Sequence, residues 1–256
     1  MIDSRAIIDP SAKLADDVSV GPWSYVGPDV EIGAGTVINS HVVIKGPTRI
    51  GAHNKIFQFA SVGEECQDKK YANEPTTLVI GDHNVIREGV TIHRGTVQDN
   101  GETIIGSHNL FMAYAHVAHD CVVGDHVILA NNASIAGHVH VGDWAILGGF
   151  TAVHQFCQIG AHVMTGASSL VLKDVPAYVM ANGNSASPHG INVEGLKRRG
   201  FSKTAIQVLR RAYKAIYREG LTVAQALERL RELEAHAPEV ALMIQSLERS
   251  TRGIIR

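Results

Sequence analysis

The chain has 256 residues, of which 45% are hydrophobic and 19% charged, and its formal net charge is −2. A net charge this close to zero argues against a nucleic-acid-binding protein, and no run of about 18 apolar residues is present that could span a membrane. The first ten residues lack the basic and apolar regions of a signal peptide. The three cysteines Cys66, Cys121 and Cys157 have no CxxC spacing, which is typical of a reducing compartment. We therefore expect a cytoplasmic protein.

An aliphatic residue recurs at every sixth position along most of the chain. The series starts at Ile8, Leu14 and Val20, resumes at Ile80 and Ile105 after two interruptions, and ends at Val171. Neither a helix nor a hairpin meander has this period, whereas a parallel β-helix built from hexapeptide repeats does. We expect three hexads in each coil and nine to ten coils in all. Cys121 and Cys157 follow repeat residues by four positions, so we expect both to fill the core.

The repeat is interrupted twice, at residues 63–79 and 93–104. Both segments are charged and show no period, so we expect loops that leave the solenoid. Long loops in a regular scaffold commonly carry function.

The period ends near Gly183, and a helical pattern follows. We therefore divide the chain into a β-helix over residues 1–184 and a helical domain over residues 185–256. Ser202 is a candidate N-cap, Thr222–Gln225 has the sequence of a capping box, and Pro238 is suited to the first turn of a last helix. The helical part has 13 Lys or Arg against seven Asp or Glu, which favours contact with an acidic partner.

The three-hexad spacing places histidine, carboxylate, bare backbone and amide groups on one strip of the solenoid. Gly137 lies one coil of three hexads after His119, Gln155 lies two coils after it, and His138 lies one coil after Asp120. Such a strip has the groups needed for acyl transfer. His119 is a candidate general base, Asp120 is a candidate partner that orients the ring, directly or through a neighbour, and the Gly137 N–H is a candidate oxyanion donor.

The chain has 14 histidines, and most are expected to be solvated corner residues. This interpretation applies to His41, His53, His83, His108, His126, His140, His162 and His236. No two histidines have the HxxxxH spacing found in zinc-containing hexapeptide-repeat proteins, so we predict no metal site.

Six segments together resemble the bacterial UDP-N-acetylglucosamine O-acyltransferase family, and the resemblance covers essentially the whole chain, including both loops and the helical tail. The segments are Ile92-His-Arg-Gly-Thr96, Ala115-His-Val-Ala-His-Asp-Cys121, Ala130-Asn-Asn-Ala133, Ala136-Gly-His138, Val153-His-Gln-Phe156 and Asn192-Val-Glu-Gly-Leu-Lys-Arg-Arg-Gly-Phe201. The strings around His119 and Arg199 are specific, whereas the hexapeptide repeat alone is shared by many acyltransferases.

The resemblance implies a left-handed β-helix, an exception to the right-handed crossover rule, and a homotrimer with each active site between two subunits. It implies transfer of an (R)-3-hydroxyacyl chain from acyl carrier protein to the glucosamine 3-hydroxyl of UDP-N-acetylglucosamine. This reaction is the first step of lipid A biosynthesis, and neither a metal nor a bound cofactor takes part.

The resemblance also assigns roles to individual residues. His119 matches the general base, Asp120 its partner, and Gly137 the backbone donor to the thioester oxygen. Residues that match the sugar and acyl site are Asp68, Lys70, His116 and His138, and those that match supporting cleft positions are His93 and His154. Residues that match contacts to the nucleotide are Gln155, Asn192, Glu194, Arg198 and Arg199; arginine forks suit a diphosphate.

Two further expectations concern the acyl donor. A basic helix face could attract an acidic carrier protein or could be an ordinary solvated face; its residues are Arg210, Arg211, Lys214 and Arg218. Ala167 matches the residue that ends the acyl groove, where Gly leaves room for a longer chain. We expect a chain near the long end, slightly shorter than a Gly enzyme prefers.

Four other functions were weighed. The N-acyltransferase of the same pathway has a further domain before the repeats, and here the repeats start near Ile8. An acyl-CoA-dependent acetyltransferase would lack the Lys197–Phe201 segment and a long apolar groove. A binding scaffold would tolerate the loss of His119, and a zinc-dependent hydratase would need the absent histidine spacing.

Overall fold

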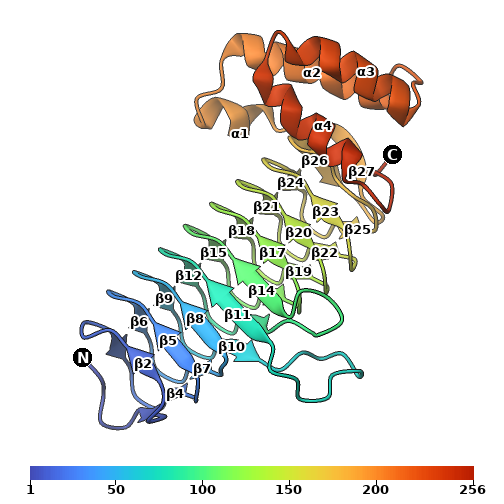
Figure 1. Ribbon diagram of the computed structural model, residues 1–256. Coiled ribbons are helices and arrows are strands. Elements are labelled where there is room, and N and C mark those ends of the chain that lie inside the picture. The colour runs from blue at the N-terminus through green and yellow to red at the C-terminus, as the bar shows by residue number, and fades with distance from the viewer.

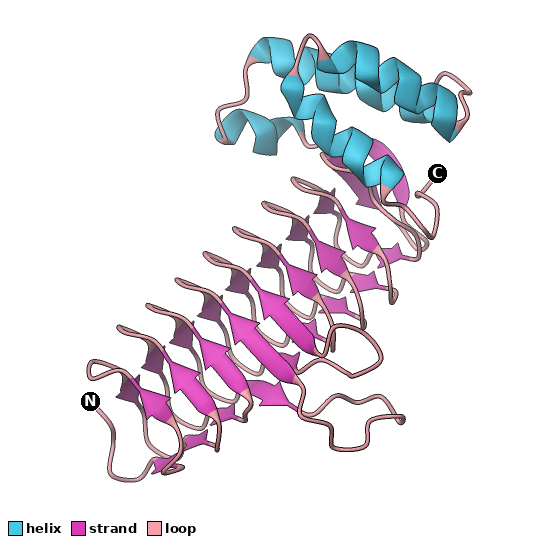
Figure 2. Cartoon of the chain, viewed as in Figure 1, coloured by secondary structure: helices cyan, strands magenta, loops and turns pink.

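The computed structural model describes residues 1–256 and shows a three-sided prism of parallel strands followed by helices (Figures 1 and 2). The nine-stranded sheet contains β1 (Ile7–Ile8), β4 (Tyr25–Val26), β7 (Val43–Ile44), β10 (Ser61–Glu64), β13 (Thr91–His93), β16 (His116–Val117), β19 (Ser134–Ile135), β22 (Ala152–Val153) and β25 (Leu170–Val171). The eight-stranded sheet contains β2 (Lys13–Leu14), β5 (Val30–Ile32), β8 (Thr48–Ile50), β11 (Thr77–Ile80), β14 (Glu102–Ile105), β17 (Val122–Val123), β20 (His140–Val141) and β23 (Gln158–Ile159). The ten-stranded sheet contains β3 (Ser19–Val20), β6 (Val37–Ile38), β9 (Lys55–Ile56), β12 (Val85–Ile86), β15 (Leu110–Phe111), β18 (Ile128–Leu129), β21 (Ile146–Leu147), β24 (Met164–Thr165), β26 (Val179–Asn182) and β27 (Ser187–Ile191).

The expected coil of three hexads is confirmed by the strand register. His116 pairs with Ser134, and Phe111 pairs with Leu129, each three hexads further on. From Val20 onward the repeat residues point inward and are buried, Val117 and Leu129 among them, whereas Ile8 and Leu14 in the first coil are partly buried. In Figure 1 the chain crosses the front, eight-stranded sheet from right to left as it climbs, so the β-helix is left-handed.

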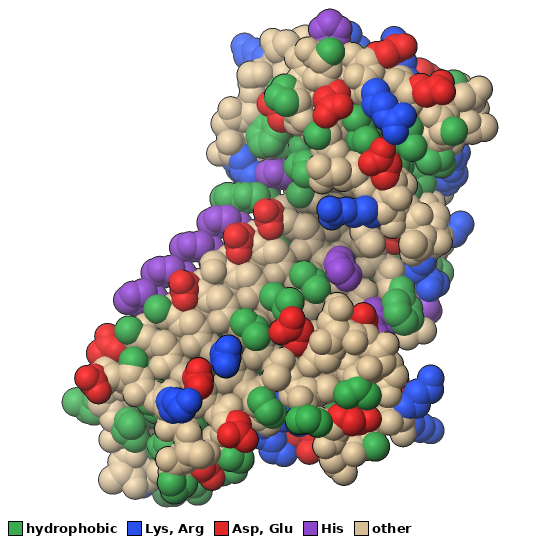
Figure 3. All heavy atoms as spheres, viewed as in Figure 1, with side chains coloured by type: hydrophobic (Ala, Val, Ile, Leu, Met, Phe, Trp, Pro, Cys, Tyr) green, Lys and Arg blue, Asp and Glu red, His purple; other side chains and the backbone are tan.

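The three edges of the prism differ in composition, and we name each by its contents. The loop corner joins the nine- and eight-stranded sheets and holds loops 65–76 and 94–101 with turns 118–121, 136–139 and 154–157. The histidine corner joins the eight- and ten-stranded sheets and includes the stacked rings of His53, His83, His108 and His126; Figure 3 shows a row of histidine side chains along this edge. The aromatic corner joins the ten- and nine-stranded sheets and exposes Trp23, Phe59, Tyr114 and Phe150.

Both predicted interruptions are loops, but they are shorter than expected. Strand β10 continues to Glu64 and β11 begins at Thr77, whereas β13 ends at His93 and β14 begins at Glu102. The flanking residues pair with the neighbouring coils, as Thr77 does with Glu102 and Leu78 does with Thr48 and Thr103, so they stay in the sheet. The core cysteines Cys121 and Cys157 are buried as expected, and burial raises the pKa of their thiols to about 12 and about 11.

The C-terminal part contains α1 (Val193–Arg198), α2 (Lys203–Tyr217), α3 (Val223–Glu234), the 3₁₀ turn η1 (Pro238–Val240) and α4 (Ala241–Glu248). Ser202 caps α2, and Thr222 with Gln225 forms the predicted capping box. The sequence interpretation missed α1, a six-residue helix that contains Gly195 and is capped by Asn192. No helix is both long enough and apolar enough to cross a membrane.

Candidate active site

His119 and Asp120 lie in turn 118–121 at the loop corner and contact each other directly. The Nδ1 atom of His119 lies 2.7 Å from Oδ2 of Asp120. Asp120 adopts φ 57°, a conformation that Asp tolerates better than most residues. Its side chain is fully buried, whereas 14% of the His119 side chain is exposed. The pair therefore has a buried carboxylate behind an imidazole that faces the surface.

Loop 94–101 supplies the other partners of the Asp120 carboxylate. The Thr96 N–H donates to Oδ1 at 2.9 Å, and the Thr96 hydroxyl donates to Oδ2 at 2.7 Å. Burial alone would raise the pKa of Asp120, but the hydrogen bonds from His119 and Thr96 outweigh it and lower that pKa. Asp120 is thus held as a carboxylate that accepts a hydrogen bond from the Nδ1–H group of His119.

The ring of His119 lies directly over the Cα atom of Gly137. A Cβ atom at position 137 would lie 2.5 Å from Cε1 and 2.6 Å from Nε2 of His119, so only glycine fits. The Gly137 N–H makes no hydrogen bond within the chain. The equivalent residue in other turns of the solenoid also has a free N–H group. The free N–H group of Gly137 differs in that it lies beside a histidine ring.

Two more histidines, His93 and His116, pack on the adjoining strands β13 and β16. Their rings meet edge to face with centroids 5.0 Å apart, and His116 Nδ1 lies 2.7 Å from the hydroxyl of Thr91. Burial, with a smaller contribution from His116, lowers the pKa of His93 to about 4. Burial also lowers the pKa of His116. Both rings are therefore neutral near pH 7.

His138 stands one coil above Asp120, as the coil arithmetic predicts. Its ring is stacked on Phe156 at 4.3 Å and meets the His119 ring edge to face at 4.9 Å. Its Nδ1 atom lies 2.7 Å from Oδ2 of Asp99. His154 and Gln155 lie in the next turn of this corner, and both are exposed.

Asp68 and Lys70 lie in loop 65–76, which leaves the same corner. The loop is tied down by Arg94, whose guanidinium donates to the carbonyls of Gly46 and Gly63 and to the Tyr71 hydroxyl. Within the loop the Lys70 N–H donates to Asp68 at 3.0 Å. Residues expected to line the sugar and acyl site thus share one edge of the prism.

The residues expected at the nucleotide end lie elsewhere. Arg199 donates to the Trp144 carbonyl at 3.1 Å and stacks over the Trp144 ring, and Asn192 donates to the His162 carbonyl. Trp144 and His162 belong to the histidine corner. Glu194 and Arg198 are exposed on α1 beside them, and Glu194 pairs with Lys197. Ala167 is exposed in the turn between β24 and β25, at the aromatic corner. A single chain therefore does not bring all the predicted site residues together.

One histidine expected to be solvated is buried instead. His162 is 8% exposed, with its ring stacked on Tyr178 and its edge toward Phe201. Burial, and then Arg199, lowers its pKa to about 4. Phe201 comes from the C-terminal part, whose packing on the solenoid has no periodic signature, so the repeat did not reveal this burial.

Sequence reasoning also missed Thr96 and Asp99, which contact the candidate catalytic residues. Both lie in loop 94–101, which has no repeat to place it. The interruption of the repeat was the signal for both, and Thr96 also ends the family-like segment Ile92–Thr96.

One group of side chains has the geometric minimum for holding a cation. The ligand atoms of His119, Asp120 and His138 lie within 4.8 Å of one another. However, the 2.7 Å contact between His119 and Asp120 has the length of a charge-assisted hydrogen bond.

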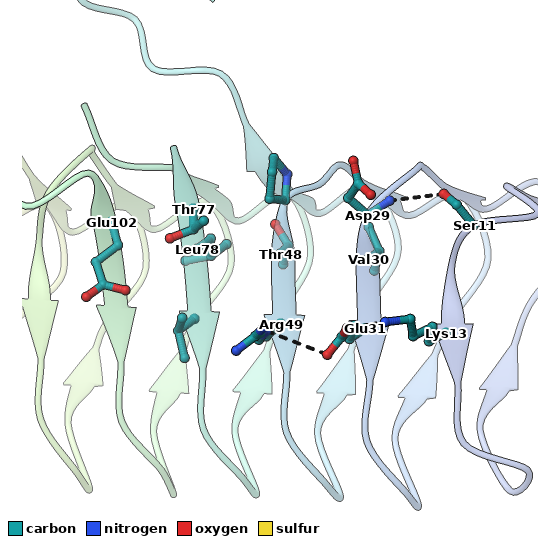
Figure 4. Close-up of a pocket in the computed structure, with 12 residues that line it drawn as sticks. Ser11, Lys13, Asp29, Val30, Glu31, Thr48, Arg49, Thr77, Leu78 and Glu102 are labelled. Atoms are coloured by element: carbon teal, nitrogen blue, oxygen red, sulfur yellow. Dashed lines mark hydrogen bonds and ion pairs between the residues drawn. The ribbon is translucent and has the colours of Figure 1, made fainter. Parts of the chain in front are cut away.

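A hollow of about 440 Å³ lies on the outer face of the eight-stranded sheet near the N-terminus. Figure 4 shows the charged side chains of Lys13, Glu31 and Arg49 in a row across its floor. Its lining contains no histidine, and its ion pairs are largely exposed. Exposed pairs of this kind contribute little, and we assign no chemistry to this hollow.

A left-handed hexapeptide β-helix with a histidine–carboxylate pair on one corner defines an acyltransferase of the hexapeptide-repeat class. Family models support this class: a bacterial transferase hexapeptide model matches residues 102–137, and the UDP-N-acetylglucosamine O-acyltransferase domain 2 model matches residues 174–255. The acyl-[acyl-carrier-protein]--UDP-N-acetylglucosamine O-acyltransferase of Stutzerimonas stutzeri is 66% identical over 256 residues, which is 100% of this chain and 99% of that protein. The chain belongs to the UDP-N-acetylglucosamine O-acyltransferase family.

Solved structures agree with this assignment. LpxA from Acinetobacter baumannii has a TM-score of 0.98 and 59% identity, covering 100% of this chain and 99% of that one. The UDP-N-acetylglucosamine O-acyltransferase of Moraxella catarrhalis has a TM-score of 0.98 and 53% identity, with the same coverage. The predicted family and fold class are confirmed.

Proposed function

We propose that this protein transfers an (R)-3-hydroxyacyl chain from acyl carrier protein to the glucosamine 3-hydroxyl of UDP-N-acetylglucosamine, the first step of lipid A biosynthesis. The observation that carries the proposal is the His119 ring, backed by buried Asp120 and lying over the free N–H of Gly137. Family membership supplies the substrate class. The proposal places the reaction in the cytoplasm, because the three cysteines are free thiols, which is typical of a reducing compartment.

The chemistry follows from the proton positions. With Asp120 accepting from Nδ1, the His119 Nε2 atom has a lone pair that takes the proton of the sugar hydroxyl. The sugar oxygen attacks the thioester carbonyl, and the Gly137 N–H donates to the resulting oxyanion. Collapse of this intermediate breaks the carbon–sulfur bond, and the thiolate leaves with the proton held by His119. Asp120 stabilises the imidazolium between the two proton transfers.

The proposal extends to the remaining residues predicted for the site. His93, His116, His138, His154, Asp68 and Lys70 would line the sugar and acyl region at the loop corner. Gln155, Asn192, Glu194, Arg198 and Arg199 would contact the nucleotide. The Nη1 atom of Arg199 is buried without a protein acceptor, which suits a residue that awaits a phosphate oxygen.

A homotrimer would join the two halves of the site. Side chains on the outer face of the ten-stranded sheet are apolar in its middle strands, as at Leu110, Ile128 and Ile146, whereas those of the nine-stranded sheet include the small Ser134 and Ala152. We propose that these two faces pack between copies, with the aromatic corners at the threefold axis. The loop corner of one chain then meets the histidine corner of the next, and His119 approaches the neighbouring copy's Arg199.

The acyl donor has two proposed contacts. Arg210, Arg211, Lys214 and Arg218 are all exposed on or beside α2, which has no acidic residue. Such a face would attract an acidic carrier protein. Ala167 would end the acyl groove, which gives a preference near the long end of the acyl series and slightly below that of a Gly enzyme.

The test is acyl transfer from a panel of 3-hydroxyacyl-acyl carrier proteins to UDP-N-acetylglucosamine, followed by mass spectrometry. We expect product from the wild type and a loss of at least about 100-fold for His119→Ala, because a general base contributes that much. His236→Ala, which changes an exposed histidine after α3 and outside the solenoid, is the matched control and should retain activity. No product with any donor, or full activity in His119→Ala, would contradict the proposal.

A further inference from the structure

Loop 94–101 brings a second carboxylate to the site. Asp99 lies 2.7 Å from Nδ1 of His138, and no other carboxylate lies that close to this ring. We propose that Asp99 is a positioning residue for the acyl transfer, which fixes the ring and proton arrangement of His138 beside His119. This inference deepens the proposed function and rests on it.

Neighbouring side chains restrict how a substrate can approach the ring of His138. Phe156 covers one face with an interplanar angle of 6°, and the His119 ring stands against it at 89°. Because a carboxylate only accepts hydrogen bonds, the contact with Asp99 places a proton on Nδ1 of His138. The Nε2 atom has no partner in the chain and is left to interact with a substrate. Only 12% of the His138 side chain is exposed, and Nε2 is not one of the buried polar atoms without a partner, so this atom remains accessible.

The same loop contacts both histidine–carboxylate pairs. Thr96 donates two hydrogen bonds to Asp120, and Asp99 lies three residues further along. A tight turn links the two, because the N–H groups of Asp99 and Gly101 both donate to the Thr96 carbonyl. The buried anchor at Thr96 thus places the half-exposed Asp99 at His138.

The other two histidines of the cluster lack such a partner. His116 is hydrogen-bonded to the neutral Thr91, and the ring of His93 packs on His116. The four rings therefore divide into two with carboxylate partners, His119 and His138, and two without. Asp99 gives His138 the same Nδ1 arrangement that Asp120 gives the proposed general base.

The experiment compares Asp99→Asn, Asp99→Glu and Asn100→Ala in the full-length protein. Asn100 lies in the same loop and is exposed, so its variant tests for damage to the loop alone. We expect Asp99→Asn to lower kcat/KM about 10-fold, mainly through kcat, because the hydrogen bond from His138 loses its charged acceptor. Asp99→Glu should recover part of this loss, and Asn100→Ala should match the wild type.

A second readout monitors the ring itself. In ¹⁵N spectra of the imidazoles, with His138→Gln used for assignment, the wild type should show the Nδ1–H form of His138. Asp99→Ala, which leaves no acceptor at this position, should lose it. An unchanged spectrum in Asp99→Ala would overturn the inference, as would an unchanged kcat/KM in Asp99→Asn or an equal loss in Asn100→Ala. If the wild type transfers no acyl group, the proposed function fails, and the spectra still decide whether Asp99 holds His138.

Discussion

Gly137 is the residue at which the proposed catalytic geometry tolerates least change. A methyl group there would overlap His119, with 2.5 Å to Cε1. In Gly137→Ala the ring must move away, and a displacement of about 1 Å costs roughly 100-fold in rate. We expect kcat to fall by about that factor in the acyl transfer assay while the melting temperature stays nearly unchanged.

Gly149→Ala is the matched control, because a Cβ atom there would meet only the Asn131 carbonyl at 3.4 Å. Equal activity in the two alanine variants would contradict the proposed contact between His119 and Gly137.

Buried histidines should make the stability depend on pH. The pKa of His162 is lowered to about 4, whereas an unfolded histidine titrates near 6.5. The unfolded state therefore binds a proton first as the pH falls. The contribution of His162 to the free energy of unfolding is therefore complete above pH 6.5 and is lost as the pH falls towards 4.

The test is His162→Phe, which keeps an aromatic ring against Tyr178 and Phe201. Between pH 7 and pH 5 the wild type should lose about 2 kcal/mol more unfolding free energy than this variant. Denaturant titrations at the two pH values measure the difference. The control is His53→Phe, which alters an exposed ring and should lose as much unfolding free energy between the two pH values as the wild type. If His162→Phe also loses as much as the wild type, burial of His162 does not make the stability depend on pH.

Among the structural elements, loop 65–76 is tied to the solenoid by a hydrogen bond from Arg94. The buried Arg94 ties it to the solenoid through the Tyr71 hydroxyl at 3.0 Å. Tyr71→Phe removes this hydrogen bond and the one that the hydroxyl donates to the Glu74 carbonyl within the loop, and it leaves the carbonyls of Gly46 and Gly63 bonded. We expect faster amide exchange in residues 66–75 and a KM for the sugar nucleotide raised roughly threefold, because Asp68 and Lys70 become less ordered.

Tyr114→Phe is the comparison, since Tyr114 is 66% exposed at another corner. If loop exchange is the same in both variants, the anchor does not order the loop.

The helices show that local signals suffice where contacts are local. Ser202 accepts from the Ala205 N–H, and Thr222 and Gln225 bond reciprocally, as their spacing predicts. Helix α1 was missed because its six residues include Gly195 and show no apolar period. Its cap at Asn192 is the one local signal that marks its start.

The molecule as a whole presents two faces that suit burial between copies and one that suits solvent. A charge at Ile128, on the outer face of the ten-stranded sheet, would be buried without a partner in the proposed trimer. We expect Ile128→Glu to dissociate the protein and to abolish acyl transfer, because Arg199 and His119 would no longer meet. Light scattering gives the mass, and the transfer assay gives the activity.

Val79→Glu places the same charge on the eight-stranded sheet, beside Arg49, and should leave both properties intact. A wild-type protein with the mass of a single chain would contradict the trimer.

The sequence by itself determined the β-helix, its coil of three hexads and the stacking of Gly137 over His119. These features are periodic, since each inward residue packs on its counterpart one coil away, and a constant register converts sequence distance into spatial position. The buried cysteines and the helix caps follow from the same periodic or local contacts.

Only the tertiary structure decided the contacts that no period governs. Loop 94–101 folds back to place Thr96 on Asp120 and Asp99 on His138, and Phe201 covers His162 from the C-terminal part. The tertiary structure also places the predicted site residues on different corners of the prism. Such contacts join segments far apart in the chain through loops of irregular length, and their geometry depends on packing that residue spacing does not encode.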